Sequence, residues 1–172
     1  SQLREAVALV YASVFYEDAR RYREATGMAP GEEKMAVVLQ ELVGTRHGEL
    51  FYPTFAGVAQ SHNYYPVCEL RPEDGAATLA LGMGKHVVEG GESLRFSPKQ
   101  PRVLPQFSSV AATLKASQRD FLALRLDAAL GELAESATLV RLPLARAEQD
   151  GELQAIGSVV SFEDDRIYDG LA

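Results

Sequence analysis

The sequence is poor in cysteine and tryptophan and has no long hydrophobic run. It contains one cysteine, Cys68, and no tryptophan, and a single cysteine can form neither an internal disulfide nor a multi-cysteine zinc site. No apolar run approaches the roughly 18–20 residues that a helix needs to span a bilayer. The chain starts with Ser-Gln-Leu-Arg-Glu, which lacks the basic flank and the apolar stretch of a signal peptide. We therefore expect a soluble protein of a reducing compartment, the cytoplasm, with no membrane partner.

An excess of basic charge is missing as well. Lys and Arg number 17 against 24 Asp and Glu, which gives a formal net charge of −7. Because a protein that binds a phosphate backbone depends on a basic surface, this balance disfavours a nucleic-acid partner. It leaves open a local basic patch around a small phosphorylated ligand. The chain has 172 residues, of which 47% are hydrophobic, so we expect a single domain over residues 1–172.

The sequence does contain apolar segments with a clear pattern. From Leu3 to Phe15, apolar residues recur at steps of three and four, which predicts an amphipathic helix that Gly27 closes. Residues 35–43 form a nearly continuous apolar run. Such a run indicates a central strand that is buried on both faces.

The rest of the chain has the pattern of short strands with few helices. Ser108 or Ser109 can cap a short helix that ends at Ser117, and residues 144–149 predict another helix. A strand broken by Pro53 and Gly57 is predicted at residues 51–60. Further strands are predicted at 64–70, 75–81, 93–96, 121–126 and 137–142, and within 151–162. Together these patterns predict an α+β fold with a mostly antiparallel sheet and flanking helices.

A glycine cluster between residues 82 and 91 is the most suggestive chemical feature. A strand that ends in Gly82-Met83-Gly84 and turns into a short helix can point backbone N–H groups at an anion. Lys85 would add a mobile positive charge. The cluster is neither a P-loop nor the dinucleotide fingerprint, because the Lys-Ser/Thr ending and the third glycine are missing. A plain glycine-rich turn is the commoner meaning of such a pattern, and both interpretations stay open.

A second candidate is the strand end formed by Gln40, Glu41, Leu42 and Val43. Extended backbone that leaves a sheet can offer one N–H and one C=O to an adenine edge, and apolar neighbours such as Leu42 can sandwich the ring. An ordinary strand end is the alternative. The three histidines show no spacing that suggests a metal site. We expect no catalytic and no metal-ligating residue in this chain.

Four motifs follow one another over the first hundred residues. They are Val-Tyr-Ala-Ser-Val-Phe and Ala-Arg-Arg-Tyr-Arg (10–15 and 19–23), Val-Leu-Gln-Glu-Leu-Val (38–43), Ala-Gly-Val with a following Asn (56–58 and 63), and Gly-Met-Gly-Lys-His-Val-Val-Glu-Gly (82–90). In kind and order they resemble motifs of the nucleotide-binding domain of the pyruvate phosphate dikinase and phosphoenolpyruvate synthase family. That family has Val-Gln-x-Met-Val, Ser-Gly-Val and Gly-Leu-Gly-Glu-x-Val-Val-x-Gly at the last three places.

The resemblance implies an ATP-grasp fold, in which two α+β lobes clasp ATP and the adenine lies near a strand that leaves one lobe. The residues it implies at the nucleotide are Gln40, Glu41, Leu42 and Val43 at the adenine, and Gly82, Gly84 and Lys85 at a sheet edge near the same cleft. The implied reaction is phosphoryl transfer from ATP, with Mg²⁺ neutralising the phosphates, to a histidine on another domain of the parent chain.

Two departures from the family limit this expectation. Lys85 stands where the family has Glu, a reversal of charge. The Arg-Ser-Ser segment and the Gln-x-Arg-Pro strand, which handle the phosphates in the family, are not found in this sequence. We therefore expect a fragment of a longer protein, a partial ATP-grasp domain that is inactive alone and depends on the remaining domains of its parent. The alternative is a non-catalytic binding or interaction module that keeps the fold.

Overall fold

The computed structural model describes residues 2–28, 34–67, 69–127 and 138–169. The chain divides into two compact units: the first holds the described residues up to Leu42, and the second begins at Val43. Each unit is described by itself. Every strand pairing in these ranges is antiparallel, and helices accompany the sheets, which confirms the predicted α+β class.

The first unit consists of two helices separated by a short break. Its elements are α1 (Gln2–Ala12), the 3-10 turn η1 (Ser13–Phe15) and α2 (Glu17–Thr26). The predicted helix is therefore confirmed as two pieces, with extended backbone at Tyr16 (φ −68°, ψ 158°) between them. Ser13 Oγ donates a hydrogen bond of 2.7 Å to the Val10 carbonyl, a bond that competes with the helical backbone pattern. Gly27, with φ +69°, ends α2 as predicted.

The segment that follows α2 contradicts the predicted strand over residues 35–43. Residues 34–44 have no regular secondary structure, and none of the strand pairings in the described ranges includes them. Val38 is 84% exposed and Leu39 is 67% exposed. An apolar run becomes a buried strand only where neighbouring strands offer their backbone groups, and no described strand does so here. The prediction of a central buried strand is wrong.

The larger sheet of the second unit has four strands in the order β1-β2-β6-β7. They are β1 (Thr45–His47), β2 (Leu50–Tyr52), β6 (Asp120–Arg125) and β7 (Leu139–Pro143). Gly48 (φ +65°) lies in the turn that joins β1 to β2. Phe51 of β2 pairs with Leu124 of β6. Phe121 and Ala123 of β6 are fully buried, so this strand lies at the centre of the sheet and of the core.

The smaller sheet has three strands in the order β3-β4-β5. They are β3 (Ala56–Gln60), β4 (Ala76–Ala80) and β5 (Leu94–Phe96). The central strand β4 is rich in alanine and largely buried, as the sequence predicts. Its neighbour approaches closely at Gly57, where a Cβ atom would lie only 2.2 Å from the Thr78 carbonyl oxygen. Small side chains are therefore what permits this sheet to form.

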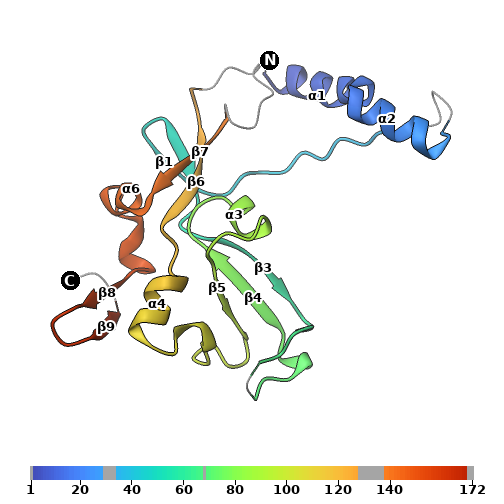
Figure 1. Ribbon diagram of the computed structural model, residues 1–172. Helices are drawn as coiled ribbons and strands as arrows, with labels where there is room; N and C mark the ends of the chain where they lie inside the picture. The colour runs from blue at the N-terminus through green and yellow to red at the C-terminus, as the bar shows by residue number, and fades with distance from the viewer. Residues whose placement is uncertain (1, 29–33, 68, 128–137, 170–172) are drawn as a thin grey trace. The chain divides into compact units, whose positions relative to one another are not determined.

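Two short helices are attached to these sheets (Figure 1). α3 (Lys85–Val88) follows β4 through the predicted Gly-x-Gly turn, and it contacts β3 and β4 of one sheet and β6 of the other. α4 (Val110–Ala116) precedes β6. The Ser109 Oγ accepts a hydrogen bond of 3.2 Å from the Ala112 N–H, so Ser109, one of the two predicted caps, is the one used.

Between β2 and β4 the chain differs from the predicted strands. The predicted break at Pro53 in the strand 51–60 is confirmed, because Pro53 has no N–H to donate to a ladder and follows the end of β2. The predicted break at Gly57 is wrong, since β3 runs through it, and the two halves belong to different sheets. The described residues of the strand predicted at 64–70 are irregular. There the Asn63 Oδ1 accepts a hydrogen bond of 3.1 Å from the Tyr65 N–H, a local turn that replaces extended backbone.

The C-terminal part agrees with the predicted pattern and extends it. Its elements are α6 (Leu144–Gln149), η4 (Glu152–Ala155), β8 (Ser158–Ser161) and β9 (Arg166–Asp169). The two remaining 3-10 turns of the second unit are η2 (Pro72–Asp74) and η3 (Pro105–Phe107). Ala147 of α6 packs into the core with Tyr52, Leu81 and Phe121. The core thus joins the larger sheet to the end of β4, where the glycine-rich segment begins.

Candidate functional site

The candidate binding residues are divided between the two units. Gln40, Glu41 and Leu42 are exposed residues of the first unit, and Val43, Gly82, Gly84 and Lys85 belong to the second. There, the glycine-rich segment (residues 82–91) runs from the end of β4 through α3, and its surroundings define what the site can do.

Gly82 is required by the packing of this segment against β6. Its φ is +85°, a conformation that favours glycine, and a Cβ atom would lie 2.7 Å from the Leu122 carbonyl oxygen. The next residue, Met83, donates its backbone N–H to the same carbonyl oxygen at 2.8 Å. Because this N–H is already used by the fold, it does not face an anion. Gly82 therefore has a structural role in the contact between the two sheets.

Gly84 stands in a different environment from Gly82. Its backbone has the ordinary helical values of φ −60° and ψ −17°. A Cβ atom there would meet only the Ala56 Cβ, at 3.6 Å, which is a normal contact. Nothing in the surrounding structure requires glycine at this position. The Gly84 carbonyl oxygen accepts hydrogen bonds of 3.1 Å from the Val87 N–H and 3.2 Å from the Val88 N–H, so of its main-chain groups the N–H is the one that can face a molecule outside the fold.

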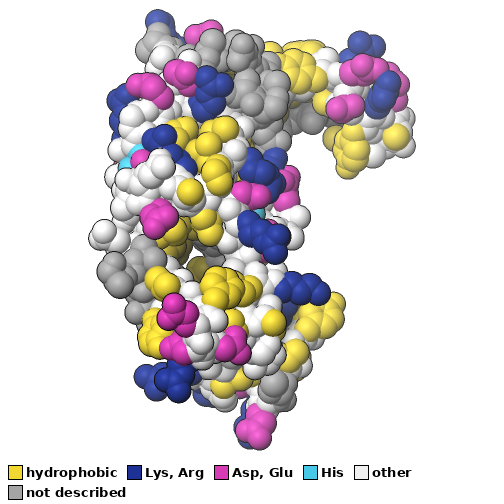
Figure 2. Space-filling model, turned by 60° about the vertical axis from the view of Figure 1, so that its left-hand side comes forward, with side chains coloured by type: hydrophobic (Ala, Val, Ile, Leu, Met, Phe, Trp, Pro, Cys, Tyr) yellow, Lys and Arg dark blue, Asp and Glu magenta, His cyan; other side chains and the backbone are white. Residues whose placement is uncertain are grey.

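Lys85 brings positive charge to the segment, but an acidic side chain accompanies it. Its Nζ lies 3.1 Å from Glu89 Oε1, one helical turn along α3. Lys and Arg side chains also lie next to Asp and Glu side chains on the face shown in Figure 2. Ion pairs that are partly open to solvent, as this one is, are screened by water and contribute little to stability. The positive charge at Lys85 is thus partly balanced within its own helix.

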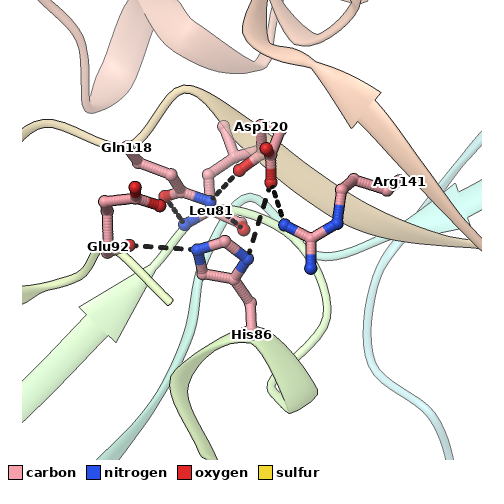
Figure 3. A network of polar contacts seen from close by, with 6 residues as sticks. All are labelled: Leu81, His86, Glu92, Gln118, Asp120 and Arg141. Carbon is pink, nitrogen blue, oxygen red and sulfur yellow. Dashed lines mark hydrogen bonds and ion pairs between the residues drawn. The ribbon is translucent and has the colours of Figure 1, made fainter. Parts of the chain in front are cut away.

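The beginning of the glycine-rich segment is held by a glutamine side chain that the sequence did not single out. Gln118 Oε1 accepts a hydrogen bond of 2.8 Å from the Leu81 N–H, and Gln118 Nε2 donates one of 3.0 Å to the Leu81 carbonyl. Figure 3 shows these contacts beside His86 and Asp120. Gln118 lies between α4 and β6, far from Leu81 in the sequence, so no local pattern could have revealed the contact.

A buried histidine holds the other end of the segment. His86 is 2% exposed, and its Nε2 lies 3.1 Å from the Glu92 carbonyl oxygen. Its Nδ1 has no hydrogen-bond partner and lies 4.0 Å from Asp120 Oδ1 (Figure 3). The same carboxylate oxygen accepts a bond of 2.5 Å from Arg141. The only sequence signal that His86 would anchor this segment was its position inside the glycine cluster.

Two residues of the family-like motifs also serve the fold. Gly57 permits the close approach of β3 to β4. Asn63 is 3% exposed, and its Oδ1 accepts a second bond, of 3.0 Å, from Arg95. These motif positions therefore shape the smaller sheet and its adjoining turn, and the glycine-rich segment is attached to that sheet through β4.

A separate polar cluster links β2 to the C-terminal helix. Tyr52 donates a hydrogen bond of 2.7 Å to Asp150 Oδ2, which also accepts one of 2.9 Å from Arg146. Burial raises the pKa of Tyr52 well above its usual value, and the bond to Asp150 raises it further. Burial would raise the pKa of Asp150 as well, but the bonds from Arg146 and Tyr52 outweigh it, so that pKa lies below its usual value. This cluster stabilises the core.

The described residues do not fit a metal ion held by the protein alone. No three His, Cys, Asp or Glu side chains in the described ranges gather in a way that could hold one, and Cys68 lies outside those ranges. Near the glycine-rich segment, Glu89 is paired with Lys85 and Asp120 with Arg141. Carboxylates that are already paired with cations are poor ligands for Mg²⁺.

Comparisons with known proteins identify the family to which this chain belongs. No curated protein and no solved structure gives a significant match to the chain. None of the described helices is long and apolar enough to cross a membrane. The family model of the pyruvate phosphate dikinase AMP/ATP-binding domain matches residues 1–138, a range that holds both candidate binding segments and all four motifs. Since this match spans most of the chain, the protein belongs to the family of the pyruvate phosphate dikinase AMP/ATP-binding domain.

Proposed function

We propose that this chain is the adenine-binding part of an ATP-dependent phosphotransferase that resembles pyruvate phosphate dikinase and phosphoenolpyruvate synthase. The observation that carries the proposal is the family match over residues 1–138, since the family is described as an AMP/ATP-binding domain. The phosphoryl group of ATP passes to a histidine on another domain of the parent protein. The chain itself supplies binding and positioning, and it is inactive alone.

The backbone of Gln40 to Val43 provides the contact to the adenine edge in this proposal. Residues 34–44 take part in no strand pairing in the described ranges, which supports the role, because their N–H and C=O groups are not used in a ladder. Leu42 and Val43 are exposed, at 48% and 78%, and can pack against the faces of the ring.

Gly84 and Lys85 provide the second contact to the nucleotide. The fold places no atom against a Cβ at Gly84 closer than 3.6 Å, so the bare backbone there can approach a ligand. Lys85 adds a positive charge. Gly82 contributes indirectly in this proposal: its close packing against Leu122 sets the direction in which the backbone continues to Gly84. Mg²⁺ enters with ATP as the Mg·ATP complex, since the described residues do not form a metal site of their own.

Calorimetry with Mg·ATP on the 172-residue chain and on the longer reading frame tests the proposal. We expect micromolar affinity in the longer protein and an affinity about 100-fold lower, or no binding, in the chain alone, because half of the contacts are missing. Absence of binding by the longer protein would overturn the proposed function. Micromolar binding by residues 1–172 alone would contradict the claim that the site is partial.

A Gly84→Ala variant of the longer protein tests the site residue by residue. We expect it to lower the affinity for Mg·ATP about tenfold, because the new methyl group occupies space that the ligand needs. Gly48→Ala in the β1–β2 turn is the control for general destabilisation, because a Cβ there meets no atom within 4 Å but the φ of +65° disfavours alanine. It should leave the affinity unchanged. Equal affinities for the two variants would remove Gly84 from the site.

The alternative function is a non-catalytic interaction module, and Lys85 is the observation that favours it. Lys85 stands where the family has Glu, and it forms an ion pair with Glu89, so a charge that the family directs to the nucleotide site has been reversed and partly neutralised here. The longer sequence separates the two functions. An upstream Arg-Ser-Ser segment with a downstream Gln-x-Arg-Pro favours the enzyme, and their absence favours the module.

A further inference from the structure

Leu81 joins β4 to the glycine-rich segment and takes part in no strand pairing of the smaller sheet. β4 ends at Ala80, whose partner on β3 is Ala56. Leu81 follows as a buried residue, 3% exposed, and it forms part of the hydrophobic core. A buried backbone N–H and C=O must find partners. For Leu81 both partners come from one side chain, that of Gln118.

The amide of Gln118 acts toward Leu81 as a neighbouring strand would. Its Oε1 accepts from the Leu81 N–H at 2.8 Å, and its Nε2 donates to the Leu81 carbonyl at 3.0 Å. The second N–H of Nε2 donates to the Asp120 carbonyl at 2.8 Å, which ties the side chain to β6. Both donors of the amide are therefore used, and the orientation of the amide is set by three partners of fixed type.

This contact fixes one side of Gly82, and β6 fixes the other. Leu81 precedes Gly82 and is held by Gln118, while Met83 follows Gly82 and donates its N–H to Leu122 at 2.8 Å. The backbone of the candidate binding residues Gly84 and Lys85 begins directly after these two anchors. A shift of the first anchor therefore changes where the Gly84 backbone is presented.

We propose that Gln118 is a positioning residue, which sets the location of Gly84 and Lys85 for a nucleotide by holding Leu81. Its effect on nucleotide binding rests on the proposed function. Its effect on the backbone of Leu81 and Met83 does not, so the two can fail separately. Gln118 touches no reacting group, and its action passes through the main chain.

A second glutamine of the same unit provides a matched control. Gln106 Oε1 accepts a hydrogen bond of 3.3 Å from the Arg95 N–H, and its Nε2 donates one of 3.2 Å to the Ser93 carbonyl. Like Gln118, it therefore bonds an N–H and a C=O of the main chain. The bonds of Gln106 are made at β5, which is the edge strand opposite β3 in the smaller sheet. They involve none of residues 82–85.

The test compares Gln118→Glu, Gln118→Leu and Gln106→Glu in the longer protein. A glutamate at 118 has an acceptor oxygen for the Leu81 N–H but loses both donors at neutral pH, so its carboxylate is repelled by the Leu81 and Asp120 carbonyl oxygens and no longer holds Leu81 in place. At pH 5 a fraction of the carboxyl groups is protonated, and this restores one of the two donors in part. Hydrogen exchange measured by NMR or mass spectrometry should show roughly tenfold lower protection at Leu81 and Met83 in both Gln118 variants at pH 7.5. Only Gln118→Glu should recover part of this protection at pH 5. Because Gln118→Leu carries the same Asp120, His86 and Arg141, it is the control for any pH effect that does not arise from residue 118.

Calorimetry with Mg·ATP on the same proteins decides whether the anchor serves binding. We expect roughly tenfold weaker binding for both Gln118 variants and unchanged binding for Gln106→Glu. Unchanged exchange at Leu81 and Met83 would overturn the positioning role, and so would changed exchange with unchanged affinity. Equal loss of affinity in Gln106→Glu would assign the effect to general destabilisation. If the unmodified protein binds no nucleotide, the proposed function fails, while the exchange measurements still test the anchor.

Discussion

Glycines in the family-like motifs have different surroundings, and substitution by alanine separates them at the scale of single residues. A Cβ at Gly57 would lie 2.2 Å from the Thr78 carbonyl oxygen, an atom that the β3–β4 ladder holds in place. We expect Gly57→Ala to lower the free energy of unfolding by about 1–3 kcal/mol, measured by urea denaturation. Gly84→Ala, with its nearest contact at 3.6 Å, should change it by less than about 0.5 kcal/mol. Equal losses would contradict this explanation.

Tyr52 offers a second test at this scale, because it combines ring packing with a hydrogen bond. Its ring lies 4.7 Å from that of Phe121 between centroids, and its hydroxyl donates to Asp150. Tyr52→Phe keeps the ring and removes the donor. We expect it to lower the free energy of unfolding at pH 7 by about 1.5–3 kcal/mol, the range for a hydrogen bond to a charged group.

The same variant predicts a pH dependence whose sign follows from Asp150. The pKa of Asp150 is lowered in the folded protein, so its contribution is present above the unfolded pKa of about 4 and is lost as the pH falls through the folded pKa. The difference between Tyr52→Phe and the unmodified protein should therefore shrink below pH 4 in urea titrations. Tyr168→Phe is the matched control, because Tyr168 donates to Asp164 in an exposed hairpin. It should leave the unfolding transition unchanged at pH 7.

Among the helices, the N-terminus of α4 gives a prediction at the scale of secondary structure. Ser109 has extended backbone (φ −153°, ψ 163°), and its Oγ accepts from the Ala112 N–H. We expect Ser109→Ala to lower the free energy of unfolding by about 1 kcal/mol. Ser108→Ala, one residue earlier, should have no measurable effect in the same thermal or urea denaturation. A larger loss at Ser108 would show that the helix begins elsewhere.

The elements that the sequence predicted correctly are those whose signals are local. β4 followed by Gly-x-Gly and α3, the cap of α4, and the strand β6 each depend on neighbouring residues. The strand predicted at 35–43 was wrong because its formation depends on a partner strand that the pattern does not specify. The break predicted at Pro53 within 51–60 was correct because it is a local signal, whereas the break predicted at Gly57 was wrong, since β3 runs through it. Only the tertiary fold assigns the two halves to different sheets.

The candidate site was predictable to the same extent. The glycine-rich segment was found because glycines at fixed spacing are a local signal. Gln118, His86 and Arg141 were not, since their roles arise from hydrogen bonds between residues far apart in the sequence. In the sequence, a loop glutamine that faces solvent cannot be distinguished from one that, like Gln118, bonds a backbone N–H and C=O in place of a neighbouring strand.

For the molecule as a whole, the acidic charge predicts how nucleotide binding depends on the metal ion. These 172 residues carry a net charge of −7, which opposes the approach of free ATP to the binding residues proposed among them, and Mg²⁺ reduces the charge of the nucleotide. We expect removal of Mg²⁺ by EDTA to weaken ATP binding by the longer protein roughly tenfold or more, measured by calorimetry. Binding of adenosine, which carries no charge, should be unaffected. Equal sensitivity of ATP and adenosine would contradict the electrostatic explanation.

The larger sheet is interrupted in sequence by the smaller one, and this has a consequence for how the protein folds. β1 and β2 precede β3 to β5, whereas β6 and β7 follow them, so the pairing of Phe51 with Leu124 closes a long loop. Closing a loop costs entropy, which the earlier formation of the β3–β4 pair inside it reduces. Pulse-labelled hydrogen exchange should show β3 and β4 amides protected before those between β2 and β6.

Gln118 and Leu122, which hold Leu81 and Met83, lie in the late part of that loop and in β6. During synthesis, a nascent chain that ends before Gln118 has already produced every candidate binding residue. It has not yet produced the groups that fix Gly82 in place. The capacity to bind a nucleotide is therefore expected to appear only after the β6 segment has emerged from the ribosome, and not when the binding residues themselves emerge.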